Sequence, residues 1–107
     1  MSNRLFQGII HQMCDAIDRT VGVIDETGTI ISCSELGRIG ESQSANLTDV
    51  FASGNTVYLD GITYLTFGSH LRHEYAVFVE GDDELASNYV KVLAVSLSSI
   101  KQFYDEK

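Results

Sequence analysis

The chain has 107 residues, of which 44% are hydrophobic, and a formal net charge of −8 from 15 acidic and 7 basic residues. This length and composition predict one globular domain, and the acidic balance argues against a surface that grips a phosphate backbone. No apolar run reaches the ~18 residues of a membrane span, and no signal peptide precedes the first helix. Cys14 and Cys33 are too few for a disulfide framework, so we expect a cytoplasmic protein with reduced thiols, a disulfide between them being the alternative.

The N-terminal segment predicts an amphipathic helix. Apolar residues recur at steps of three and four from Leu5 to Ile17, the spacing that places side chains on one helical face. Ser2 is suited to cap the start of this helix. Gly8 interrupts the pattern; the helix either tolerates it at a small cost or uses it to let a partner backbone approach, and we favour tolerance.

A β-hairpin is expected next. Val21 and Val23 supply apolar positions of the first strand, and Ile30 and Ile31 those of the second. The turn between them, Asp25-Glu26-Thr27-Gly28, ends in a glycine that can adopt a positive φ.

A short polar loop with one arginine follows the hairpin. Ser34, Arg38 and the backbone amides around Gly40 could together hold a carboxylate or a phosphate, because a guanidinium matches an anion bidentately and glycine lets amides approach it closely. The alternative is that Arg38 pairs with Glu35 or Glu41 and only ties the loop down. The residues alone leave both readings open.

The central part predicts a short helix and then three strands. Leu47, Val50 and Phe51 are the apolar positions of the possible helix, inside a segment rich in serine, asparagine and glycine. Asp60-Gly61 is a strong hairpin signal between two strands with alternating apolar residues. The run from Tyr75 to Val79 favours a central strand.

The segment 69–73 is the densest cationic stretch of this acidic chain, and we expect it to be a turn. His70, Arg72 and His73 could attract an anion there, or form a solvated loop; a metal site is a minor reading, because neither cysteine is close enough in sequence to complete it. Tyr64 could line a pocket beside these residues, although aromatic residues at alternating strand positions are more often core residues.

A long helix closes the chain. Acidic residues at 82–84 stand where the positive end of a helix dipole favours them, and an apolar stripe continues from Leu85 to Tyr104. The stripe is wider than one face packed on a sheet requires, since Val90, Ala94 and Val95 extend it. We expect either contact with a second subunit or deeper burial within the domain.

These elements predict an α+β domain with a five-stranded antiparallel sheet and N- and C-terminal helices, as in PAS, GAF or profilin-like folds. The segment Thr20–Glu41, with its strand, acidic turn, second strand, Ser34 and Arg38-Ile39-Gly40-Glu41, resembles the N-terminal sensory domain of the sugar-diacid (CdaR-like) and purine-catabolism (PucR-like) transcriptional regulators of bacteria. The resemblance extends more weakly along the first and last helices. It implies a PAS- or GAF-like sensor, here residues 1–107, placed N-terminal to a DNA-binding segment outside this chain.

The resulting hypothesis is a domain that senses a small anionic metabolite, forms a homodimer and passes occupancy on through its terminal helices. Its proposed ligand-binding residues are Ser34, Arg38, Gly40, Tyr64, His70, Arg72 and His73. A dimerisation module without a ligand is the alternative. We expect no enzyme, because no phosphate-binding loop, nucleophile elbow or separable carboxylate pair is recognisable. We also expect no cofactor, no resident metal and no membrane partner.

Overall fold

The structure is a computed structural model that describes residues 2–42, 50–51, 56–69 and 72–105, with side chains described for 6–42, 50–51, 56–67 and 75–99. Its elements are α1 (Ser2–Cys14), β1 (Val21–Asp25), β2 (Ile30–Cys33), the 3₁₀ turn η1 (Leu36–Arg38), β3 (Val57–Leu59), β4 (Ile62–Ser69), β5 (Arg72–Glu80) and α3 (Glu84–Asp105). The strands form one antiparallel sheet in the order β2-β1-β5-β4-β3. The predicted α+β class is thereby confirmed.

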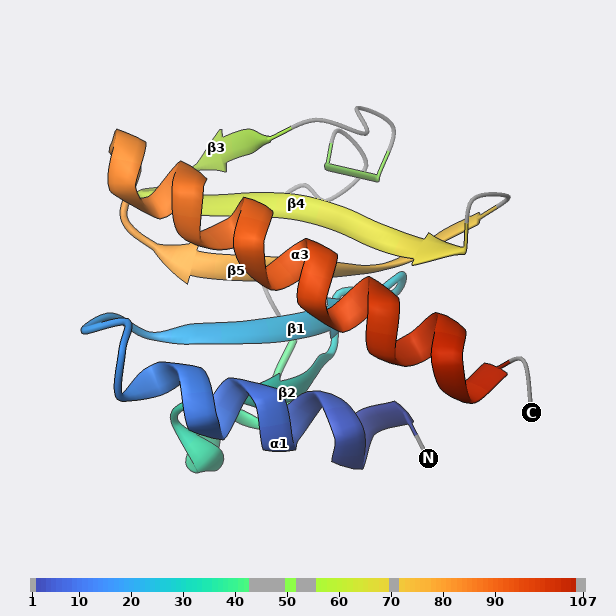
Figure 1. Cartoon of the computed structure of the whole chain (residues 1–107). Coiled ribbons are helices and arrows are strands. Elements are labelled where there is room, and N and C mark those ends of the chain that lie inside the picture. The colour runs from blue at the N-terminus through green and yellow to red at the C-terminus, as the bar shows by residue number, and fades with distance from the viewer. Residues whose placement is uncertain (1, 43–49, 52–55, 70–71, 106–107) are drawn as a thin grey trace.

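Both helices lie on one face of the sheet (Figure 1), α3 across β4 and β5 and α1 along β1 and β2. Between helices and sheet lies the helix-side core, in which apolar side chains from the two layers are fully buried. Its members include Phe6, Ile10, Val21, Val23, Val77, Val79, Val90, Leu93 and Leu97. Burying each such side chain contributes about 1.5–3 kcal/mol, so this layer holds the two helices in place.

The opposite face of the sheet carries a second apolar cluster, the opposite-face core. Because successive side chains of a strand point to opposite faces, the residues between those of the helix-side core gather here. The buried members are Ile24, Ile30, Cys33, Val50, Tyr64, Ala76 and Phe78. Gly22 belongs to the same face, since a Cβ there would come within 2.6 Å of both the Phe78 ring and the Ser32 carbonyl oxygen.

The two predicted hairpins are confirmed. Gly28 has a φ of 87°, and Asp25 Oδ1 accepts the amides of Thr27 at 2.9 Å and Thr29 at 3.1 Å, which fixes the first turn. In the second turn Asp60 and Gly61 have φ values of 52° and 75°. Two consecutive left-handed residues match the right-handed twist of paired strands, so the Asp-Gly pair sets this register.

The helices agree with expectation except at their boundaries. α1 ends at Cys14, so Ile17 is not helical, although its side chain is buried. Ser2 is expected to cap α1, but its side chain is not among those that the structure describes. A Cβ at Gly8 would meet nothing within 4 Å, which agrees with simple tolerance. α3 begins at Glu84.

The structure narrows two expectations. In the segment 69–73, expected to be a turn, Ser69 belongs to β4 and pairs with Arg72, the first residue of β5, so the strands extend further than the sequence pattern indicated, and residues 70–71 lie outside the described residues. In the wide stripe of α3, Val90 and Ala94 are buried and Val95 is exposed, so burial within the domain accounts for only part of the stripe. In the expected short helix, Val50 and Phe51 are helical and Leu47 lies outside the described residues.

Candidate functional site

The chain after β2 folds back along the outer edge of that strand. The amide of Gly40 donates to the carbonyl of Ile30 at 2.8 Å, and the amide of Ile30 donates to the carbonyl of Glu41 at 2.8 Å. Thr29 and Ser42 form an isolated bridge next to these bonds. The returning loop thus occupies backbone groups of an edge strand that would otherwise be open to another chain.

The other end of β2 is held by side chains. Gln7 of α1 accepts the Cys33 amide at 3.0 Å and donates to the Cys33 carbonyl at 3.1 Å, as a neighbouring strand would. Ser34 follows, and its amide donates to the Val21 carbonyl at 2.8 Å while its hydroxyl oxygen accepts the Val21 amide at 3.1 Å. A hydroxyl that accepts one bond still carries a proton to donate.

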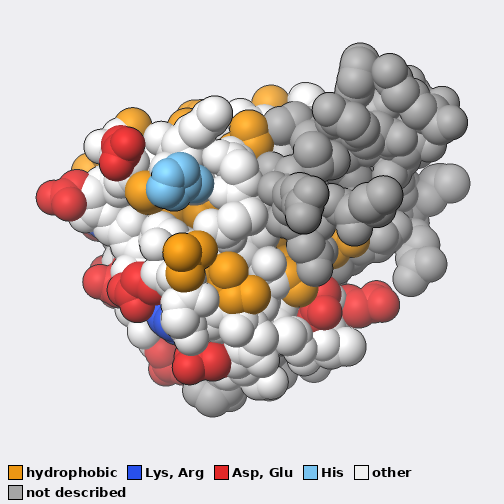
Figure 2. Space-filling model, turned by 90° about the horizontal axis from the view of Figure 1, so that it is seen from below, with side chains coloured by type: hydrophobic (Ala, Val, Ile, Leu, Met, Phe, Trp, Pro, Cys, Tyr) orange, Lys and Arg blue, Asp and Glu red, His pale blue; other side chains and the backbone are white. Residues whose placement is uncertain are grey.

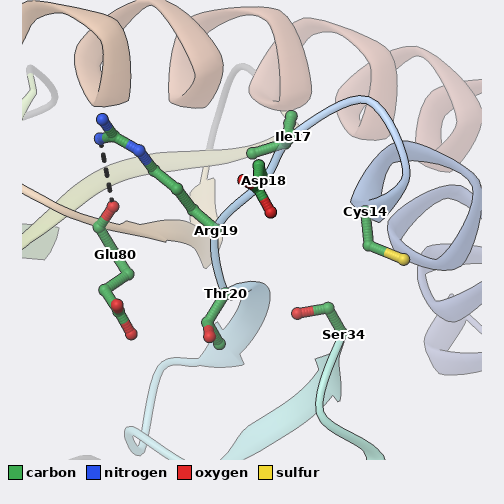
Figure 3. Close-up of a pocket in the computed structure, with 7 residues that line it drawn as sticks. All are labelled: Cys14, Ile17, Asp18, Arg19, Thr20, Ser34 and Glu80. Atoms are coloured by element: carbon green, nitrogen blue, oxygen red, sulfur yellow. Dashed lines mark hydrogen bonds between the residues drawn. The ribbon is translucent and has the colours of Figure 1, made fainter.

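Ser34 opens onto a hollow of about 390 Å³ at the end of the sheet where the α1–β1 connection, β2 and β5 meet. The hollow is lined by Cys14, Ile17, Asp18, Arg19, Thr20, Ser34 and Glu80. Figure 3 shows Cys14 and Ser34 on one side of it and Arg19 on the other, with the guanidinium directed away from Ser34. Two hydroxyls, a thiol and two carboxylates give it a polar lining.

Arg19 joins this hollow to the start of α3. Its guanidinium forms a bidentate ion pair with Asp83, at 2.6 Å from Nη1 to Oδ1 and 2.7 Å from Nη2 to Oδ2, and Nη1 also donates to the Glu80 carbonyl at 3.4 Å. Asp83 Oδ1 accepts the Ala86 amide at 3.0 Å and so caps α3. The hydrogen bonds from Arg19 and then Ala86 hold the pKa of Asp83 well below its usual range.

Gly81 makes room for that ion pair. Its φ is +115°, which favours glycine, and a Cβ at this position would collide with Arg19 Nη1. The sequence pattern gave no indication of a role for Arg19. No motif links an arginine before the first strand to an aspartate 64 residues later.

Arg38 lies in η1, between Ser34 and the returning loop. Its Nε is 4.0 Å from Glu41 Oε1, a long contact between partly exposed side chains, so the pairing with Glu41 considered from the sequence is present. The amide of Arg38 donates to Glu35 and that of Gly40 to Ile30. The amides expected to be free around Gly40 are therefore bonded in this conformation, that of Arg38 to the residue that precedes η1 and that of Gly40 at the edge of β2.

The remaining predicted residues do not join Ser34. Tyr64 is buried in the opposite-face core with its ring centroid 6.3 Å from that of Phe78, so its core reading is confirmed. Arg72 and His73 belong to β5, but their side chains are not among those described, and His70 lies outside the described residues. Of the predicted site residues, Ser34 alone is among the described residues that line the hollow.

The thiols and the carboxylates complete the chemistry of this region. Cys14 and Cys33 are both free, and burial raises the pKa of the Cys33 thiol, which keeps it protonated and unreactive. In the described part of the chain no three His, Cys, Asp or Glu side chains are grouped to hold a metal ion. Figure 2 shows acidic side chains at several places on the face seen there, with hydrophobic side chains between them.

Comparison with known proteins gives no assignment: no protein-family model matches this chain, and no curated protein matches it either. Within the described ranges neither helix is both long and apolar enough to cross a membrane.

Proposed function

We propose that the chain is the sensory domain of a cytoplasmic bacterial transcriptional regulator, and that it binds a small acidic metabolite beside Ser34. The observation that carries the proposal is the shallow, open hollow of about 390 Å³ onto which Ser34 opens, a volume within the range of about 300–1,000 Å³ that is typical of ligand sites. The regulatory context comes from the resemblance of the segment Thr20–Glu41.

The lining favours a hydroxy acid over a simple acid. Ser34 and Thr20 bring hydroxyls, and Asp18 and Glu80 bring carboxylates that can accept hydrogen bonds from ligand hydroxyls. The acid group itself needs a cation. We assign this role to Arg38, which follows Ser34 in the same loop but lies outside the lining of the hollow. Its 4.0 Å contact with Glu41 is long, so an acid could replace it, whereas Asp83 holds Arg19 bidentately.

The test is a thermal-shift screen of organic diacids, hydroxy acids and, for comparison, amines, followed by calorimetry on the compounds that bind. Arg38→Gln is expected to weaken the binding of an acid by roughly 10- to 100-fold, because one charged hydrogen-bonding partner is lost. Lys91→Gln removes the same charge from α3 and is the matched control. The assignment fails if no acid binds, or if Arg38→Gln and Ser34→Ala both leave the affinity unchanged.

A dimerisation module without a ligand is the second candidate, and a specific observation favours it. Leu85, Val92 and Val95 of α3 are exposed, and apolar side chains gathered on one helix are typical of interaction surfaces. This candidate requires self-association and no response to any compound of the screen. The ligand screen described above therefore distinguishes the two functions.

A further inference from the structure

The outer face of α3 carries a row of exposed apolar side chains, here called the outer row. Leu85, Val92 and Val95 have 46%, 54% and 68% of their surface exposed. Positions seven and three residues apart lie on one side of a helix, so these three share a face. The other side of α3 is used by the helix-side core through Val90 and Leu93. The outer row is therefore not required for packing within the domain.

α3 contains the longest stretch of the chain without an acidic residue. Of 15 acidic residues among 107, none lies between Leu85 and Tyr104. Acidic residues stand at both ends of this stretch instead, at 82–84 and at 105–106. Two copies of a protein with net charge −8 repel each other over most of their surfaces, but along this stretch they can approach without opposing carboxylates.

We propose that the outer row is the contact surface for a second copy of this chain, with the two α3 helices antiparallel and Val92 of one copy against Val95 of the other. The inference rests on the self-association that both candidate functions include. A two-fold axis makes such a contact reciprocal, so the Val92–Val95 contact occurs twice. The two exposed valines then cover each other at the middle of the interface.

Symmetry favours the antiparallel orientation over a parallel one. In a parallel two-fold pair each residue opposes its own copy, which brings Glu84 beside Glu84 and Lys91 beside Lys91. Like charges set opposite each other are destabilising. An antiparallel pair centred between Val92 and Val95 separates both pairs of like charges, and it also opposes the two helix dipoles.

The expected dimer is weak. α3 has 22 residues and is thus about 33 Å long, and a contact made by one helix from each partner lies at the low end of interface sizes, below roughly 1,200 Å² in total. Sedimentation velocity should accordingly show a monomer–dimer equilibrium that depends on protein concentration. A chain that stays monomeric up to millimolar concentration overturns the proposal.

A charge placed in the outer row tests the surface itself. Val95→Glu should raise the dissociation constant of the dimer about tenfold or more, because it brings carboxylates into the apolar contact. Leu36→Glu adds the same charge to a residue with 65% exposure on η1, and it should leave the constant nearly unchanged. Equal effects of the two variants, or no effect of Val95→Glu, overturn the proposal.

Cysteine cross-linking tests the orientation. In a Cys14→Ser background, which removes the partly exposed thiol, a tagged Val92→Cys chain is mixed with an untagged Val95→Cys chain and oxidised. The antiparallel pair predicts the mixed disulfide as the main product, and Val92 homodimers as the main product overturn it. A dimer that cross-links as expected but ignores every compound in the ligand screen upholds this inference and refutes sensing.

Discussion

The exchange Gly22→Ala tests whether the opposite-face core is packed as tightly as the structure has it. An alanine Cβ would lie 2.6 Å from Phe78 Cζ, 2.7 Å from Phe78 Cε2 and 2.6 Å from the Ser32 carbonyl oxygen. The ring is buried, and the carbonyl belongs to the neighbouring strand β2. Neither can yield without moving β1 from β2 or pushing the ring into the core.

The size of the effect follows from this geometry. Adding one methyl group to a well-packed core costs about 1–3 kcal/mol, and a contact with backbone places Gly22→Ala in the upper part of that range. Gly8→Ala is the matched control, since nothing lies within 4 Å of its Cβ. It should stabilise α1 by about 0.5–1 kcal/mol, because alanine costs less than glycine in a helix.

Urea unfolding followed by circular dichroism measures both free energies. The two variants should shift the midpoint in opposite directions with an unchanged slope, since the surface exposed on unfolding stays the same. The double variant Gly22→Ala/Phe78→Leu should lose less stability than the two single variants lose together, because the Phe78 ring is one of the groups that the added Cβ would meet. A Gly22→Ala protein as stable as the wild type would refute the close packing inferred here.

Three further exchanges probe the anchors of the site. Asp83→Asn keeps a cap for α3 but loses the ion pair with Arg19. Because Arg19 depresses the pKa of Asp83, the stability lost in this variant should be constant at neutral pH, should begin to shrink as the pH falls below about 4, and should disappear only below the depressed pKa of the folded protein. Gly81→Ala should destabilise by more than about 1 kcal/mol in chemical unfolding, because of its positive φ and its contact with Arg19. Gln7→Ala should cost about 1–2 kcal/mol and speed hydrogen exchange of the Cys33 amide.

Two of these exchanges have a matched control variant. Gln12→Ala removes an exposed glutamine from the same helix as Gln7 and should leave the exchange rate unchanged. Gly37→Ala introduces a Cβ that meets nothing within 4 Å, so its stability should stay close to that of the wild type. An Asp83→Asn protein whose deficit persists undiminished in acid would show that the ion pair does not produce the pH dependence.

Much of the fold could be predicted because local chemistry decides it. The turns at Gly28 and at Asp60-Gly61 follow from the preference of those residues for positive φ, and the start of α3 follows from the acidic residues before it. The candidate site could be predicted only in part. Ser34 does line the hollow, whereas Tyr64 is a core residue and the Gly40 amide is bonded to Ile30.

The amino-acid sequence by itself determined the α+β class, the two hairpins, the two helices and an acidic surface interrupted along the last helix. These depend on spacing, turn residues and charge, all of which act between neighbours in the chain. The tertiary structure alone decided that Arg19 meets Asp83, that Gln7 completes the edge of β2 and that Ser34 borders the hollow. Such contacts join residues far apart in the sequence, so they exist only once the strand order β2-β1-β5-β4-β3 and the packing of both helices on one face have been set.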